Sequence, residues 1–165
     1  MATFRMSILG FSTKPDSSGD VFPEPQSVKG TNDFFDQLVY IFNDSGTKIG
    51  LYGSFEVPEN YVGGAKFVPA WDTTATSGDV EWDIDYRAVA AGESVDQATA
   101  QEALNQNDTA GGSAHLLQVA ELSATAGNFS PGDLVQYIIY RDGVDAGDTI
   151  AASVRLLKLN FEWTN

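Results

Sequence analysis

The sequence contains no cysteine and a single histidine, His115, among its 165 residues. The missing cysteines exclude disulfides, thiol chemistry and thiolate-bound metals. With one histidine, histidine-rich metal sites and Cys–His pairs are excluded as well. A Ser-His-Asp triad would have to use His115, which lies in the run SAHLL without the Gly-x-Ser-x-Gly turn that exposes a nucleophilic serine. We therefore interpret His115 as a structural or surface residue.

Basic residues are also scarce, with nine Lys and Arg against 23 Asp and Glu, so the formal net charge is −14. A surface of this sign repels phosphate backbones, and free nucleic acid is not an expected partner. The imbalance is concentrated in residues 72–148, where 14 acids accompany only Arg87 and Arg141. This charge either serves solubility or marks an outer face, with a more neutral docking end formed by the termini.

Long apolar runs are missing too. No segment approaches the roughly 18 apolar residues of a membrane span, and the start MATFRMSILG lacks the apolar core of a signal peptide. We expect no membrane partner and synthesis in the cytoplasm. The whole chain, residues 1–165, is expected to be one domain whose core needs no cofactor or metal.

What the sequence does contain is a series of short strand patterns separated by turn residues. Gln37–Phe42 (QLVYIF) is typical of a buried central strand, and after the turn Asn43–Gly46 the stretch Thr47–Val57 alternates, which predicts a hairpin. Phe11–Pro25 is rich in Pro, Ser, Gly and Asp and predicts a loop or docking arm, residues 11–25. Further strands are expected over residues 3–9, 66–71, 114–122, 133–140 and 150–163.

The most regular pattern is Asp79–Ala88 (DVEWDIDYRA). Strict alternation over ten residues indicates a strand with one face buried and one in water. The expected core residues are Val80, Trp82, Ile84 and Tyr86, and the expected solvated residues are Glu81, Asp83 and Asp85.

Residues 93–106 contain the only candidate helix, of one or two turns, because Ser94 and Gln97 match a capping box. About eight antiparallel strands and one short helix predict an all-β jelly-roll sandwich.

One carboxylate pair resembles a catalytic arrangement. Asp83 and Asp85 share a strand face about 7 Å apart, and glycosidases with this architecture use two carboxylates. The neighbouring aromatic residues Trp82 and Tyr86 point to the opposite face, which favours a solvated acidic surface over a catalytic cleft.

A second set of carboxylates is a weak calcium candidate. Asp142, Asp145 and Asp148 recur every three residues in a loop that contains glycine. The alternate ligands and distal glutamate of an EF-hand are missing, so a hairpin turn closed by Asp-Gly is the preferred interpretation.

An ordered series of motifs runs through the second half of the chain. Its elements are the acidic strand with Trp82 and Tyr86, the run Gly92–Gln97, the strand start Gly132–Val135, the turn Arg141–Gly143 and the stretch from Asp148 to Trp163. This series, over residues 78–99 and 127–163, resembles β-sandwich structural proteins of tailed bacteriophages. These include capsid decoration (cement) proteins and fibre or tail components.

The resemblance implies a non-enzymatic virion protein on the outer capsid surface that binds the major capsid protein, stabilises the head and forms a homotrimer. The last strand is compatible with a trimer, because apolar residues of both parities need cover, from a second subunit or from the monomer itself. Candidate capsid or subunit contacts are Arg5, Lys14, Arg155, Lys158, Phe161 and Trp163.

A carbohydrate-binding jelly-roll component of a head fibre or tail is the alternative, with a glycan as partner. It requires an exposed aromatic platform with carboxylate and amide neighbours. The candidate aromatic residues are Tyr52, Tyr61, Trp71 and Trp163. A jelly-roll hydrolase or isomerase is a third class, for which the sequence contains no catalytic motif.

Overall fold

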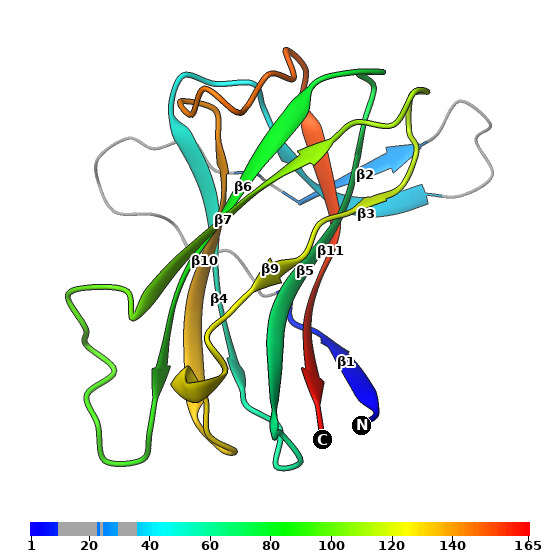
Figure 1. Ribbon diagram of the computed structural model, residues 1–165. Helices are drawn as coiled ribbons and strands as arrows, with labels where there is room; N and C mark the ends of the chain where they lie inside the picture. Colours follow the sequence, from blue (N-terminus) through cyan, green and yellow to red (C-terminus); the bar gives the residue numbers. More distant parts are fainter. Residues whose placement is uncertain (10–22, 24, 30–35) are drawn as a thin grey trace.

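The computed structural model describes residues 1–9, 23, 25–29 and 36–165 (Figure 1). Two antiparallel sheets face each other across one hydrophobic core. The seven strands of the first sheet are β1 (Thr3–Ser7), β2 (Pro25–Lys29), β3 (Asp36–Phe42), β5 (Gly63–Thr73), β8 (Gln118–Val119), β9 (Leu122–Ser123) and β11 (Val154–Thr164). The four strands of the second sheet are β4 (Lys48–Glu56), β6 (Asp79–Val89), β7 (Glu102–Thr109) and β10 (Leu134–Asp142).

The strand order is that of a jelly roll. The first sheet runs β2-β3-β11-β5-β8 and the second runs β4-β10-β6-β7. Between β3 and β11 the chain passes repeatedly from one sheet to the other, and β8 and β9 both pair with β5 as two pieces of one interrupted strand. The prediction of an all-β jelly-roll sandwich of about eight strands is confirmed.

The alternating pattern of β6 has the predicted parity. Trp82 has none of its side chain exposed and packs against the rings of Phe42 and Trp71, with centroid separations of 5.3 and 6.3 Å. The other predicted core residues of β6 are also buried, with at most 1% exposed: Val80, Ile84 and Tyr86. The prediction that the opposite face is in water is wrong for Glu81, which is 4% exposed. Strand β6 lies inside its sheet, and the loop after β10 lies against it through a hydrogen bond from the Glu81 N–H to Asp148.

The helix predicted over residues 93–106 is wrong. The segment before Glu102 has no regular structure, and β7 pairs antiparallel with β6 from Tyr86 to Asp79. Ser94 and Gln97 do interact, but the Gln97 amide donates to the Ser94 carbonyl and closes a turn. Two features disfavour the helix. The free edge of β6 offers backbone hydrogen bonds to this segment, and the segment has few apolar residues at helical spacing. The short 3₁₀ helix of the described chain, η1, lies at Ala126–Asn128.

The hairpin predicted from β3 and β4 is also wrong. β3 pairs with β2 and β11, whereas β4 pairs with β10 in the other sheet, so Asn43–Gly46 connects the two sheets. Spacing alone does not distinguish a hairpin from such an arch, because both reverse the chain within four residues. β3 was expected to be fully buried, but only its second half is.

The bulge in β11 removes the physical reason for expecting a subunit against this strand. Its pairing with β5 shifts register between Leu156 and Lys158. The shift takes Leu157 out of the alternation, so the apolar residues before and after it face the same core. These buried residues are Val154, Leu156, Leu159, Phe161 and Trp163. β11 is an internal strand between β3 and β5, and its two apolar parities are both covered within the monomer.

Most of the predicted docking arm, residues 11–25, lies outside the described residues; Pro23 and Pro25 are described. Within the described ranges, no helix has the length and apolar character that crossing a membrane requires.

Candidate functional site

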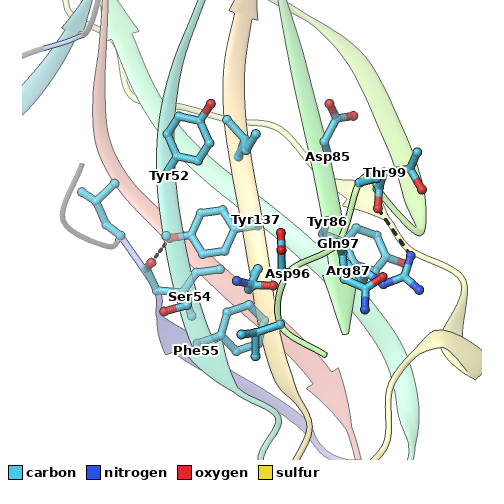
Figure 2. A pocket seen from close by; sticks show the side chains of 18 of the residues that line it. Tyr52, Ser54, Phe55, Asp85, Tyr86, Arg87, Asp96, Gln97, Thr99 and Tyr137 are labelled. Carbon is cyan, nitrogen blue, oxygen red and sulfur yellow. Dashed lines mark hydrogen bonds between the residues drawn. The ribbon is translucent and has the colours of Figure 1, made fainter. Parts of the chain in front are cut away.

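A groove of about 820 Å³ opens on the outer face of the second sheet. Its floor is formed by β4, β10 and β6, one wall by the loop Val95–Ala100, and its far side by Ser7–Leu9 next to β4 (Figure 2). The floor residues are Tyr52, Ser54, Gln136, Ile138, Asp85 and Arg87.

The strand register brings these side chains together in rows. Tyr52, Ile138 and Asp85 are direct cross-strand neighbours, and Ser54, Gln136 and Arg87 form the next row. Alternate residues of each strand share a face. The face opposite the core therefore gathers polar residues and Tyr52 from three strands that are far apart in sequence.

A second tyrosine lies on the same face, one row from Tyr52. Tyr140 is opposite both Gly50 and Asp83. A Cβ at Gly50 would lie 2.5 Å from Cδ1 of Tyr140, so the missing side chain leaves the space that the ring occupies. Lys48 Nζ lies 5.6 Å from the centre of the Tyr140 ring, within the range of a cation–π interaction.

The walls of the groove are tied to the sandwich by hydrogen bonds. The Arg87 guanidinium donates to the carbonyl of Thr99 at 3.4 Å, and the Ala88 N–H donates to the Gln101 side chain at 3.0 Å. On the other side, the Tyr137 hydroxyl donates to the carbonyl of Ile8 (Figure 2). These contacts hold both borders against the floor.

Next to the groove, Lys48 joins two carboxylates. Its ammonium lies 2.5 Å from Asp83 and 2.8 Å from Asp142. Burial works against the charged ammonium, but the hydrogen bonds to Asp142 and Asp83 raise the pKa of Lys48. Burial would likewise raise the pKa of Asp142, and its hydrogen bonds to Lys48 and Val144 outweigh this effect and lower that pKa.

Of the four aromatic residues predicted as a glycan platform, the structure places one in the groove, Tyr52. Tyr61, Trp71 and Trp163 are core residues, 7%, 0% and 6% exposed. Their polar atoms are used internally, as in the hydrogen bond of 2.7 Å from Trp71 Nε1 to Asp108.

Two of the candidate capsid contacts lie near opposite ends of β11. Arg5 pairs with Glu162, and Arg155 pairs with Asp72 at the other end of β11. Lys158 is exposed.

The two aromatic contact candidates, Phe161 and Trp163, belong to the core and are not available to a partner. Lys14 is outside the described residues.

The carboxylates of the calcium candidate loop have separate partners. Asp148 forms two hydrogen bonds with Arg141 at 2.8 and 2.7 Å, Asp142 pairs with Lys48, and Asp145 accepts from the N–H of Gly147 at 2.7 Å. In the part of the chain that the structure describes, no three acidic or histidine side chains are placed to hold a metal ion.

His115 belongs to an ion-pair cluster. Its Nδ1 lies 3.2 Å from an Asp72 carboxylate oxygen and 2.7 Å from Nη2 of Arg155. Its φ of 62° is in the left-handed region, which is uncommon outside glycine. This placement fits the structural interpretation of His115.

Sequence reasoning missed Gln136, Tyr140 and the loop Val95–Ala100. The alternation in LVQYIIY places Gln136, Ile138 and Tyr140 on one face, and that signal was present in the sequence. Which strands adjoin β10 depends on sheet order, and the loop was assigned to a helix.

No protein-family model matches this chain, and no curated protein matches it. Among solved structures, the chain is similar to a cleaved adhesin domain of Lys-gingipain from Porphyromonas gingivalis, with 15% identity, full coverage of both chains and a TM-score of 0.50. It is also similar to a family 6 carbohydrate-binding module from Clostridium cellulolyticum solved with xylose, with 11% identity, 98% and 97% coverage and a TM-score of 0.44. A third similar structure is the CBM36-1 domain of a multidomain xylanase from the hindgut metagenome of Trinervitermes trinervoides, with 12% identity, 99% and 98% coverage and a TM-score of 0.42. The likeness to the adhesin domain concerns the two-sheet fold alone.

Proposed function

We propose that this protein is a non-enzymatic carbohydrate-binding β-sandwich that holds a saccharide in the groove on β4, β10 and β6. The observation that carries the proposal is the partly exposed ring of Tyr52 among carboxylate, guanidinium, amide and hydroxyl groups in a single groove. A groove of about 820 Å³ is within the range of ligand sites.

The chemistry of this groove suits a sugar. A pyranose has an apolar C–H face, which packs on an aromatic ring, and a rim of hydroxyls that both donate and accept hydrogen bonds. Tyr52 supplies the ring, with an apolar body and a polar tip. Asp85 accepts from hydroxyls, Arg87 donates to them, and Gln136 does both. Charged groups make the stronger of these hydrogen bonds.

The same face does not have the arrangement of a glycosidase. Asp83 and Asp85 project side by side from one strand, about 7 Å apart at Cα, instead of facing each other across a bound sugar. Asp83 is also held by Lys48. We therefore propose binding without hydrolysis.

The test is binding to a glycan array, followed by calorimetry with the best neutral saccharide. Tyr52→Ala should weaken binding roughly tenfold or more, about 1.4 kcal/mol, with unfolding unchanged because the ring is on the outer face. Leu117→Ala is the matched control, since Leu117 is 66% exposed and lies just before β8 of the other sheet. A protein that binds no glycan, or binds equally well as Tyr52→Ala, would contradict the proposal.

A virion role is a separate proposal, motivated by the resemblance over residues 78–99 and 127–163. In it, the protein binds the major capsid protein on the outside of a phage head, as a homotrimer on the shell. Heads stripped of the protein should release their genome at a lower temperature, because a ligand that binds only the closed shell stabilises it. Heads that melt identically with and without the protein would remove this role, and the groove could still bind a glycan.

A further inference from the structure

Carboxylates follow β6 along the face that forms the groove. Glu81, Asp83 and Asp85 occupy alternate positions, so their Cα atoms are spaced about 7 Å apart. Asp85 lies in the floor of the groove, and Asp96 adds a carboxylate from the loop wall. Asp83 and its neighbour Asp142 lie beyond the floor, around Lys48.

The cations on this face are already engaged. Lys48 is shared between two carboxylates, and Arg87 donates to a backbone carbonyl of the loop. Among the described residues, carboxylates that include Glu56, Asp83, Asp85, Asp96 and Asp142 outnumber the two cations Lys48 and Arg87 on the face and its loop wall. An excess of negative charge therefore surrounds whatever lies in the groove.

The pKa values of two groups reflect the negative electrostatic field that these carboxylates create. Burial, together with the charges of neighbouring acids, raises the pKa of Glu81 to about 7; these acids are Asp83, Asp145, Asp142 and Asp148. Glu81 Oε2 is buried without a hydrogen-bond partner, so it is an acceptor with no donor.

Tyr140 gives the same sign nearer to the floor. Burial raises its pKa to about 12, with the charge of Asp85 as the next contribution. The charge of Asp85, which contributes to this raised pKa, would also disfavour a negative ligand at this place.

We propose that the groove selects saccharides by charge, binding amine-bearing sugars more tightly than neutral ones and excluding uronic and sulfated ones. This inference rests on the proposed function, since it concerns the ligand of the same groove. An ammonium on the sugar would approach Asp85 and Asp96 as a donor, whereas a carboxylate or sulfate would find Arg87 already donating to the Thr99 carbonyl. The affinity should therefore decrease from amine-bearing to neutral to acidic sugars, because the field in the groove is negative.

The experiment uses immobilised sugars in matched triplets: glucose, glucosamine and glucuronate, and galactose, galactosamine and galacturonate, each as the same linked oligomer. Binding is measured at pH 6, where the sugar amine is protonated, in low and high salt. At low salt the amine and acid members should differ by roughly 100-fold in affinity, about 2.8 kcal/mol. At 1 M salt the difference should nearly vanish, because the screening length falls to about 3 Å.

Asp96→Asn should reduce the affinity ratio between the amine and acid sugars by about threefold, since it removes one charge from the loop wall without touching Tyr52. Glu121→Gln is the matched control, because Glu121 is an exposed acid beside the other sheet and its loss changes net charge equally. Equal binding within each triplet overturns the charge selection while leaving the proposed function in place. An amine-bearing sugar that binds Tyr52→Ala as tightly as it binds the native chain also overturns the proposal, since the amine then binds the acidic surface outside the groove. If the wild-type protein binds no member, the proposed function itself fails.

Discussion

At the scale of single residues, Trp82 is the centre of the core between the two sheets. It is fully buried and packs edge-on against Phe42 and Trp71. Trp82→Ala should therefore lower the free energy of unfolding by about 3–5 kcal/mol, as large-to-small core changes do. Denaturant unfolding measures this, with Leu117→Ala as a surface control expected to stay within about 0.5 kcal/mol. A loss below about 1 kcal/mol for Trp82→Ala would contradict the packing described here.

Glu81 should make stability fall as pH rises. Its pKa in the folded protein is about 7, above the ordinary value of 4.5. Between these two values the folded state holds a proton that the unfolded state has lost, so unfolding becomes easier with each step of pH. The stabilisation is complete below about pH 4.5 and is lost through pH 7.

The measurement is the free energy of unfolding from pH 5 to 8 for the native chain and for Glu81→Gln. The native chain should lose about 1–3 kcal/mol more than the variant over this range. Parallel curves for the two proteins would show that Glu81 titrates normally.

These two residues also show what single-residue patterns can and cannot predict. The burial of Trp82 followed from alternation along its own strand. The burial of Glu81 did not, because it depends on β10 and its following loop lying beside β6. The outer face of an internal strand is covered by neighbours that the strand's own sequence does not identify.

At the scale of elements, Gly53 allows strand β4 to lie close to its neighbour β10. Gly53 is opposite Tyr137 on the core side, and a Cβ there would overlap the tyrosine ring and hydroxyl. Tyr137 is 3% exposed and its hydroxyl reaches the carbonyl of Ile8, so the ring has little room to move. Gly53→Ala should destabilise the fold by about 1–3 kcal/mol, the usual cost of overpacking.

Thermal and denaturant unfolding of Gly53→Ala test this expectation. Gly112→Ala is the matched control, since a Cβ at Gly112 meets nothing within 4 Å. If both variants unfold like the native chain, the close approach of Tyr137 to β4 is not as described. A shift in the near-ultraviolet circular dichroism of Gly53→Ala alone would report the displaced ring.

Most strands, and hence the fold class, could be predicted from the sequence because turn residues punctuate the apolar patterns. Their connections could not. The arch between β3 and β4 has the spacing of a hairpin, and the segment leading into β7 has the capping residues of a helix. The groove could not be predicted either, because it depends on the order of three strands in the sheet. One of its rows joins Tyr52, Ile138 and Asp85 across these strands. Of these residues, only Tyr52 was named as a binding candidate from sequence.

At the scale of the whole molecule, the basic residues do not form a separate docking end. Arg5, Lys48, Lys66 and Arg155 each pair with a carboxylate of the same chain. The two termini lie together at one end of the sandwich (Figure 1), whereas Arg155 is at the opposite end of β11. The docking orientation expected from the charge imbalance of the sequence has no support in the described residues.

The last prediction concerns the state of the chain in solution. Because of the bulge after Leu156, the buried apolar residues on both sides of it face the same core. This strand therefore needs no neighbouring subunit to cover apolar side chains. A net charge of −14 on each chain opposes close packing of copies at low salt. We therefore expect a folded monomer of 17.7 kDa at micromolar concentration in sedimentation equilibrium. The homotrimer implied by the phage resemblance would then form on the capsid lattice, where the shell supplies the contacts.

A stable trimer in free solution would contradict this expectation and would require an interface on the described surface or in the segments outside it. The exposed apolar residues Leu116, Leu117 and Val119, which lie close together next to β5, are the place to test. Leu117→Asp should dissociate a trimer that uses this patch and leave the unfolding of the monomer unchanged, because the side chain is 66% exposed. A trimer that persists in Leu117→Asp excludes this patch as the interface.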